Sequence, residues 1–203
     1  MHPPPSANRG ETRLEPVFQL AESCDYGAEH ANQVAWLALR LFDELQALHG
    51  LGEEERFWLQ CGAILHDIGW IAGQRGHHKA SLRIILDTPL LPFSLRQRRI
   101  IGSIARYHRK ALPSERHEHY SALEPAERDR VRTLAAILRL ADGLDCTHRS
   151  VIENISCEVT AQQILVRCVA SVPAEAERRE ALDKGQLLEQ ALGRQLAIHW
   201  ALN

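Results

Sequence analysis

Helical spacing of apolar residues is the feature that most restricts how this 203-residue chain can fold. In the first such run, Val34, Leu37, Leu41, Leu45 and Leu48 recur every three or four residues, which places them on one face of an α-helix. Comparable runs predict helices over residues 26–50, 53–69, 81–87, 92–108 and 125–145. The chain before Ser150 is therefore expected to form a helical domain with a proper core.

The pattern changes after Ser150. Residues 152–160 and 164–170 are rich in β-branched side chains with rough alternation, which indicates a β-hairpin. An Ala-, Glu- and Leu-rich helix is predicted over 175–192, and a last strand over 195–200. These elements form a small α+β unit.

The predicted fold class is therefore mainly α, with three parts. Residues 1–13 are polar and rich in proline, and we expect a disordered arm there. Residues 14–150 form the helical domain, and residues 151–203 form the α+β unit (β-hairpin, helix and strand) packed on it.

Composition argues against several classes of protein. The formal net charge of -2 does not suit a protein that coats a nucleic-acid duplex or binds a membrane through a polybasic segment. No stretch approaches the roughly 18 apolar residues of a membrane-spanning helix, and the first residues lack an apolar secretion signal. The five cysteines form no C-x-x-C pair, which fits reduced thiols and a cytoplasmic protein.

Four residues in apolar helical settings have the chemistry of metal ligands: His30, the adjacent pair His66 and Asp67, and Asp142. Neighbours on a helix point about 100° apart, so His66 and Asp67 can lean to one edge of the same face. Imidazole and carboxylate donors suit one divalent cation such as Mn, Fe, Co, Ni or Zn, and tolerate Mg. Each residue alone is more often a hydrogen-bonded core histidine, a helix cap or a salt-bridge partner. Together they predict a metal site, with Asp145 accepting a hydrogen bond behind it.

Basic residues flank these segments and predict contacts to phosphate, because Arg binds phosphate through two parallel hydrogen bonds and Lys as a point charge. Asp67, His108 and His78 are the predicted catalytic residues, with His108 the first candidate for a general acid and His78 the second. The predicted phosphate-binding residues are Lys79, Arg106, Arg109, Lys110 and Arg149. The alternative for each is an ordinary solvated loop residue.

The order His30, His66-Asp67 and Asp142 resembles the HD superfamily of metal-dependent phosphohydrolases. A narrower resemblance is to the C-terminal HD region of the exopolyphosphatase/guanosine-pentaphosphate phosphohydrolase (Ppx/GppA) family, over roughly residues 25–200. It rests on the segments Glu29–Ala31, Ala63–Gly69, His77–Ser81, Ala105–Lys110 and Leu138–Asp145. The resemblance implies a phosphohydrolase that acts on a phosphorylated nucleotide or a polyphosphate-like substrate, and a homodimer.

Two departures from that family matter. Nothing in the chain resembles the actin-like catalytic module that usually precedes this region, so the resemblance does not extend to that active site. The family usually has His-Lys-His-Ser where this chain has His78, Lys79, Ala80 and Ser81. His77 or His78 could replace the missing histidine, but the shift moves the imidazole by several ångströms, so one cation is favoured over two.

Two functions remain open at this point. One is a metal-dependent phosphohydrolase. The other is a non-catalytic module that binds phosphate or polyphosphate, or supports oligomer formation, and has lost the chemistry. The apolar segment 90–93 would suit a dimer contact if it is exposed and core packing if it is buried.

Overall fold

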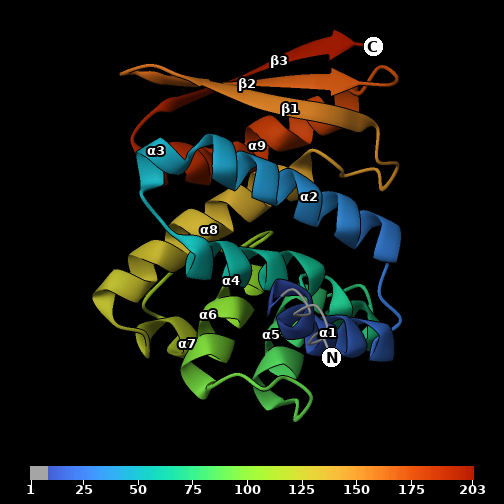
Figure 1. Cartoon of the computed structure of the whole chain (residues 1–203), viewed down its shortest axis with the longest axis vertical. Helices are drawn as coiled ribbons and strands as arrows, with labels where there is room; N and C mark the ends of the chain where they lie inside the picture. The colour runs from blue at the N-terminus through green and yellow to red at the C-terminus, as the bar shows by residue number, and fades with distance from the viewer. Residues whose placement is uncertain (1–8) are drawn as a thin grey trace, which may run out of the picture.

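The computed structural model describes residues 9–203, where helices carry most of the chain and a three-stranded sheet covers one end (Figure 1). The helical part consists of α1 (Arg9–Ser23), α2 (Ala28–Glu44), α3 (Gln46–His49), α4 (Glu53–Ile64), the 3-10 helix η1 (Ile68–Ala72), α5 (His77–Asp87), α6 (Leu95–Arg106), α7 (Glu118–Ser121) and α8 (Pro125–Gly143). The remainder is β1 (Ile152–Val159), β2 (Gln163–Ala170), α9 (Glu175–Leu192) and β3 (Gln195–Leu202). The predicted fold class is confirmed.

Helix α8 runs through the middle of the helical part and contacts α2, α4, α6 and α9. Its start follows from local chemistry, because Pro125 occupies the first turn and the side chain of Glu127 accepts a hydrogen bond from the backbone N–H of Glu124 at 2.9 Å. Its second half is buried on every side, from Leu134 to Gly143. Asp142 therefore lies in the core, among the apolar residues of this part of the helix.

The sheet has the strand order β1-β2-β3, with β1 and β2 antiparallel and β2 and β3 parallel. Helix α9 connects β2 to β3 and packs between the sheet and α8, while β1 contacts α2 (Figure 1). Gly143 allows α8 and α9 to approach closely, since a Cβ atom at this position would lie 2.8 Å from Cα of Ala181. This contact brings the C-terminal unit next to Asp142.

The predicted disordered arm is wrong for residues 9–13, because α1 begins at Arg9. Val17, Leu20 and Ala21 lie on one buried face of this helix, and Arg13 donates hydrogen bonds to the carboxylate of Glu54 on α4. These contacts outweigh Pro16, which removes a backbone donor inside the helix. Residues 1–8 of the predicted arm lie outside the described residues.

Other predictions of local structure are confirmed or corrected. The hairpin, the helix over 175–192 and the last strand are present, with the strand extended to Leu202. Helix α5 begins at His77 instead of residue 81. The segment 90–93 is divided, since Leu91 is fully buried and Phe93 packs edge-on against Phe57, whereas Leu90 and Pro92 are exposed. The homodimer stays a prediction.

Two further properties concern the described part as a whole. Its five cysteines are all free thiols. Between residues 9 and 203, no helix has both the length and the apolar character needed to cross a bilayer.

Candidate metal centre

A turn after α4 sets the direction of His66 and Asp67. The predicted helix over 53–69 is wrong at its end, because α4 stops at Ile64 and both residues lie in the turn before η1. The hydroxyl of Ser81 donates to the carbonyl of His66 at 2.7 Å and accepts from the N–H of Gly69 at 2.9 Å. The turn is thereby attached to α5, and Asp67 faces the first residue of that helix.

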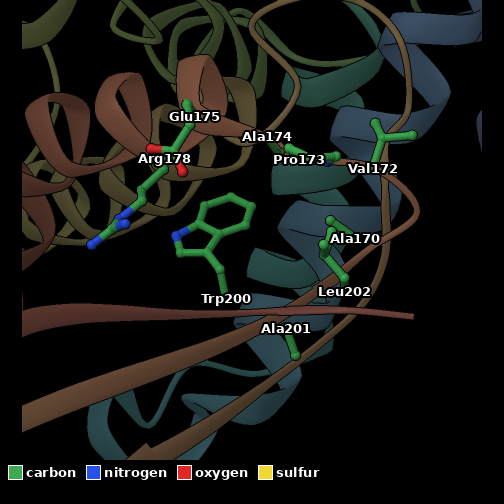
Figure 2. A pocket seen from close by; sticks show the side chains of 9 residues that line it. All are labelled: Ala170, Val172, Pro173, Ala174, Glu175, Arg178, Trp200, Ala201 and Leu202. Atoms are coloured by element: carbon green, nitrogen blue, oxygen red, sulfur yellow. The ribbon is translucent and has the colours of Figure 1, made fainter.

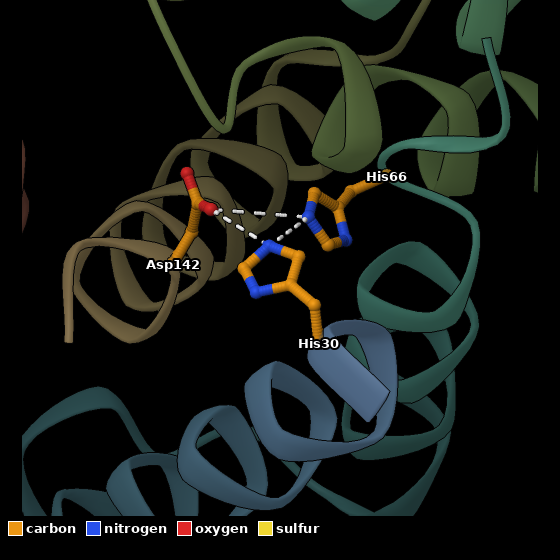
Figure 3. Close-up of side chains that lie close together, drawn as sticks. All are labelled: His30, His66 and Asp142. Atoms are coloured by element: carbon orange, nitrogen blue, oxygen red, sulfur yellow. Dashed lines mark hydrogen bonds and ion pairs between the residues drawn. The ribbon is translucent and has the colours of Figure 1, made fainter. Parts of the chain in front are cut away.

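Three residues from distant parts of the chain meet in the core as the first cluster, which consists of His30, His66 and Asp142 (Figure 3). Nε2 of His30 lies 3.4 Å from Oδ1 of Asp142 and 3.2 Å from Nε2 of His66. Nε2 of His66 lies 3.8 Å from the same Oδ1 atom. All three side chains are buried, and all three residues are predicted ligands.

A second cluster adjoins the first and consists of Asp67, His77 and His108. Oδ1 of Asp67 lies 3.1 Å from Nε2 of His77 and 3.4 Å from Nε2 of His108. The other carboxylate oxygen, Oδ2, lies 3.6 Å from Nε2 of His66. Asp67 therefore links the two clusters, with one oxygen directed to each.

The four imidazoles of the two clusters share one orientation. Nδ1 of His66, His77 and His108 lies 2.6 Å, 2.9 Å and 2.7 Å, respectively, from the carbonyl oxygen three residues earlier. A carbonyl oxygen only accepts hydrogen bonds, so each Nδ1 carries the proton and each Nε2 keeps a lone pair. His30 follows the same rule, with Nδ1 2.7 Å from Oδ2 of Asp145. All four Nε2 atoms are thus free to act as ligands.

The donor set fits divalent cations. Two ligand atoms that each lie about 2.1 Å from a metal are about 3.0 Å apart at octahedral angles and about 3.4 Å apart at tetrahedral angles. The separations within the two clusters, from 3.1 Å to 3.8 Å, lie close to that range. Oδ1 of Asp67 is buried and has no hydrogen-bond partner among the described residues. A carboxylate oxygen left in this state is costly unless a cation binds it.

Two residues outside the clusters, Asp145 and Lys184, position ligands through hydrogen bonds. Asp145, the predicted hydrogen-bond acceptor, is fully buried and bonds His30 through Oδ2 and the N–H of Ser150 through Oδ1, the latter at 2.7 Å. Lys184 of α9 donates a hydrogen bond of 2.5 Å to Oδ2 of Asp142. Oδ1 of Asp142 is thereby left to the first cluster.

The pKa values of the site residues depend on two effects, which are burial and the charged or hydrogen-bonding groups beside them. Burial lowers the pKa of His30, but hydrogen bonds to Asp142 and Asp145 outweigh it and raise the value to about 9. Burial raises the pKa of Asp142, but Lys184 and the imidazoles hold it well below its usual range. The pKa of Asp67 is likewise lowered by its imidazole neighbours against the effect of burial. In the absence of a cation, His30 therefore carries a proton that a bound cation would displace, and its charge offsets part of the charge of the carboxylates.

His108 lies among the ligands and is 1% exposed. Burial lowers its pKa to about 3, so the ring is neutral at pH 7. A neutral, enclosed ring suits a ligand and does not suit the general acid that the sequence predicts. His78, the second predicted acid, lies outside both clusters and lines a neighbouring cavity.

The predicted phosphate-binding residues divide into three groups. Lys79, Arg109 and Lys110 line cavities beside the second cluster. Arg106 is buried at the end of α6, and its Nη1 atom has no hydrogen-bond partner among the described residues. Arg149 is exposed in the turn after α8 and lines neither of these cavities.

Three residues of the centre are not among the predicted site residues. His77 is named only as one of two replacements for the histidine missing at Ala80. His148 stacks on His30, with ring centroids 3.7 Å apart, and sits on the solvent side of the centre. Lys184 lies 42 residues beyond its partner Asp142, and no local pattern marks it. Only the histidine content of the loop after Gly73 could have drawn attention to His77.

A separate cavity of about 250 Å³ lies in the C-terminal unit (Figure 2). The indole of Trp200 rises from β3 toward α9, where Glu175 and Arg178 lie at the edge of the cavity. The rest of the lining is mostly aliphatic. This cavity contains neither histidine nor cysteine, and it has no contact with the two clusters.

Comparison with known proteins agrees with the sequence motifs. A family described as Ppx/GppA phosphatase, domain III, matches residues 12–192. The guanosine-5'-triphosphate,3'-diphosphate pyrophosphatase of Vibrio vulnificus is 29% identical over 195 residues, which are 95% of this chain and 37% of that protein. The protein of the same name from Pseudoalteromonas atlantica is 25% identical over 134 residues, which are 66% of this chain and 26% of that protein.

The chain therefore spans less than two fifths of the length of these relatives. The family match, in contrast, extends over most of the chain. The chain belongs to the Ppx/GppA phosphatase family and corresponds to its domain III.

Proposed function

We propose that this protein is a metal-dependent phosphohydrolase whose centre binds two divalent cations. One site consists of the first cluster, with Asp67 as a fourth ligand, and the other is the second cluster. The observation that carries the proposal is the common orientation of four imidazoles, whose Nδ1 atoms are all hydrogen-bonded and whose Nε2 atoms all face carboxylate oxygens: His30, His66, His77 and His108. The sequence favours one cation because of Ala80, and the proposal now has two because His77 supplies the missing imidazole.

The chemistry follows from the charges that the residues supply. Bound divalent cations lower the pKa of water and offset negative charge on a phosphoryl group. Asp67, Asp142 and the buried imidazoles keep this region fixed and largely closed to bulk solvent, which strengthens the electrostatic interactions inside it. Lys79, Arg109 and Lys110 lie beside the second cluster and orient the anionic substrate.

We assign to His148 the donation of a proton to the leaving oxygen of the substrate. A ring nitrogen of His148 lies within 4.8 Å of ligand atoms of His30 and Asp67, and the side chain is exposed. It replaces the buried His108 in the role of general acid, since a proton donor needs access to both substrate and solvent. Burial lowers the pKa of His148 below 6.5, so it fills this role toward acidic pH.

The substrate class we propose is a phosphorylated nucleotide or a polyphosphate-like molecule. The two relatives are named guanosine-5'-triphosphate,3'-diphosphate pyrophosphatases, after a nucleotide that carries five phosphates. The rim of basic side chains suits such polyanions. The five free thiols fit a reducing compartment, and we place the protein in the cytoplasm.

Elemental analysis of protein purified without chelator tests the proposal. We expect about two equivalents of Mn, Fe, Co, Ni, Zn or Mg in the wild type after incubation with the metal. The variants His30→Ala and His77→Ala should each lose one equivalent, and Asp67→Ala should lose both. His199→Ala is the matched control, because it removes an exposed histidine of β3 far from the centre.

A wild-type protein that binds no metal in excess Mn and Mg would exclude the hydrolase. That result would favour the alternative function, a non-catalytic module that binds phosphate or supports assembly. Metal binding without hydrolysis of p-nitrophenyl phosphate, pyrophosphate or GTP would exclude catalysis on these substrates and leave the metal centre in place.

A further inference from the structure

The cavity in the C-terminal unit has one apolar side and one charged side (Figure 2). Its volume is about 250 Å³, which is below the roughly 300–1,000 Å³ of sites for drug-sized molecules and suits a smaller ligand. Val172, Pro173 and Leu202, together with three alanines, form the apolar side. Glu175 and Arg178 of α9 form the charged side. An apolar lining with a few polar groups at one edge is the usual composition of a small-molecule site.

The two charged side chains of the cavity are neighbours on α9 but do not pair with each other. Glu175 and Arg178 are three residues apart, a spacing at which the Cβ atoms on a helix lie about 5–6 Å apart. Among residues 9–203, neither side chain takes part in a salt bridge or in a side-chain hydrogen bond, whereas Lys184 and Glu180 of the same helix pair at 3.5 Å. A carboxylate and a guanidinium at the same edge of the cavity are therefore both available to a ligand.

The indole of Trp200 supplies a third polar group. Its Nε1 atom is buried and has no hydrogen-bond partner among the described residues. An indole N–H only donates, and a buried donor is rarely left without an acceptor. Figure 2 shows the indole nitrogen on the side of Arg178 and the six-membered ring toward the apolar side. An acceptor of the ligand on this side can bind both Arg178 and the indole N–H.

The apolar side of the cavity is fixed by the core but is not fully covered. Val172, Ala174 and Trp200 pack against the buried core of the protein. Leu202, in contrast, is 62% exposed. The lining is thus largely preformed, and a ligand with an apolar part would remove some of this surface from water.

We infer that this cavity is a binding site for a free α-amino acid with an apolar side chain. The carboxylate of Glu175 binds the ammonium group of the ligand, while Arg178 and the N–H of Trp200 donate hydrogen bonds to its carboxylate. The apolar side of the cavity packs against the ligand side chain. A simple anion would bind Arg178 but meet the like charge of Glu175, and a simple cation would meet the like charge of Arg178. A zwitterion uses both groups.

Calorimetric titration of the full chain in EDTA tests the site by itself, because its lining shares no residue with the two clusters. The probes are L-leucine and L-phenylalanine. Each is compared with the analogue that lacks the ammonium group, 4-methylpentanoate or 3-phenylpropanoate, and with the analogue that lacks the carboxylate, 3-methylbutylamine or 2-phenylethylamine. We expect at least one of the two amino acids to bind about tenfold or more tightly than either of its analogues.

Three variants test the assignment of the polar groups. Glu175→Gln and Arg178→Gln should each lower the affinity for the amino acid about tenfold, and Glu175→Gln should not weaken the analogue without the ammonium group. Trp200→Phe keeps an aromatic ring but removes the N–H, and should lower the affinity for the amino acid about tenfold. Asp183→Asn and Arg179→Gln are the matched controls, because they remove the same charges from exposed positions of α9 outside the cavity, and they should retain wild-type affinity.

Absence of binding by both amino acids at concentrations up to about 10 mM would overturn the inference. Equal affinity for an amino acid and for its analogue without the ammonium group would also overturn it, and would identify a site for a simple carboxylate. Wild-type affinity in both Glu175→Gln and Arg178→Gln would place the bound amino acid elsewhere on the protein and overturn the inference in the same way.

Discussion

Nζ of Lys184 lies 2.5 Å from Oδ2 of Asp142, which connects the C-terminal unit directly to the candidate metal centre. Both side chains are nearly buried, and Gly143 allows the two helices to come close enough for this contact. Oδ1 of the same carboxylate faces Nε2 of His30 at 3.4 Å. Asp142 thus has one oxygen for the structure of the domain and one for the site.

Replacing Lys184 should destabilise the metal-free protein. In Lys184→Met the apolar part of the side chain is kept, but Asp142 becomes a buried charge without its main partner. Loss of one member of a buried pair costs about 3 kcal/mol in the free energy of unfolding, which urea denaturation in EDTA would measure. Arg56→Met is the control, because it breaks an exposed pair with Asp43 and should cost less than about 1 kcal/mol. Equal losses in the two variants would contradict the role given to Lys184.

Asp145→Asn should weaken metal binding at the first cluster. Asp145 accepts two hydrogen bonds, from Nδ1 of His30 and from the N–H of Ser150, through different oxygens. Asparagine has one acceptor oxygen, so one of these bonds is lost and His30 is less firmly oriented. We expect about a tenfold loss of Mn affinity for one of the two ions, measured by calorimetry.

The control for that variant is Asp129→Asn, which removes an exposed carboxylate of α8. An unchanged affinity in Asp145→Asn, or an equal loss in the control, would show that Asp145 does not orient the ligand. A loss at both ions would place its effect on the whole centre instead of on His30.

The fold could be predicted where local signals determine it. The helix over 175–192 has its predicted bounds, because Gly193 ends it in the left-handed conformation, with φ of 64°. The hairpin follows from β-branched residues on either side of a short turn. In contrast, α1 contains Pro16 and is stabilised by contacts to α4, which lies some forty residues further along the chain. Such contacts are not visible in a local pattern.

The candidate site could likewise be predicted only in part. His30, His66 and Asp142 are identifiable because polar ligand types stand out in apolar helices. The position of His77 depends on the turn at Gly69 and on the hydrogen bonds that connect this turn to Ser81. The sequence pattern predicts a continuous helix over residues 53–69 and therefore does not show the turn. Lys184 is an ordinary lysine in an amphipathic helix until the fold brings it to Asp142. The sequence shows which residues have the chemistry of ligands, but which groups they contact depends on how the fold brings distant segments together.

Gly69→Ala should disrupt the centre through its backbone. A Cβ atom at this position would lie 2.1 Å from the carbonyl oxygen of His77 and 2.5 Å from the N–H nitrogen of Ser81, and backbone atoms cannot move aside easily. We expect a loss of about 3 kcal/mol in unfolding free energy and weaker metal binding at the second cluster. Gly27→Ala is the control, because a Cβ atom there meets nothing within 4 Å, and it should cost less than about 1 kcal/mol. A stable Gly69→Ala variant with full metal content would show that this close approach is not needed.

His49 should make the stability of the protein depend on pH at a position far from the centre. Its Nδ1 atom accepts from the N–H of Leu51 at 3.0 Å, and its Nε2–H donates to the carbonyl of Phe42 at 2.9 Å, so the neutral ring is required. Burial lowers the pKa of His49 below its ordinary value of 6.5. The unfolded chain takes up the proton first as the pH falls below 6.5, so the contribution is complete above that pH and declines below it.

His49→Asn keeps an acceptor for Leu51 but cannot titrate, and this variant isolates the effect. At pH 8 the wild type should be more stable by about 1 kcal/mol, because the variant lacks the bond to Phe42. The difference in unfolding free energy should narrow steadily as the pH falls from 8 to 5. Ser94→Ala, which removes a helix cap without removing a titratable group, should show a difference that is constant over the same range. A gap between wild type and His49→Asn that stays constant toward pH 5 would mean that the folded protein binds the proton as readily as the unfolded chain, and a gap that widens would mean that folding raises the pKa of the ring.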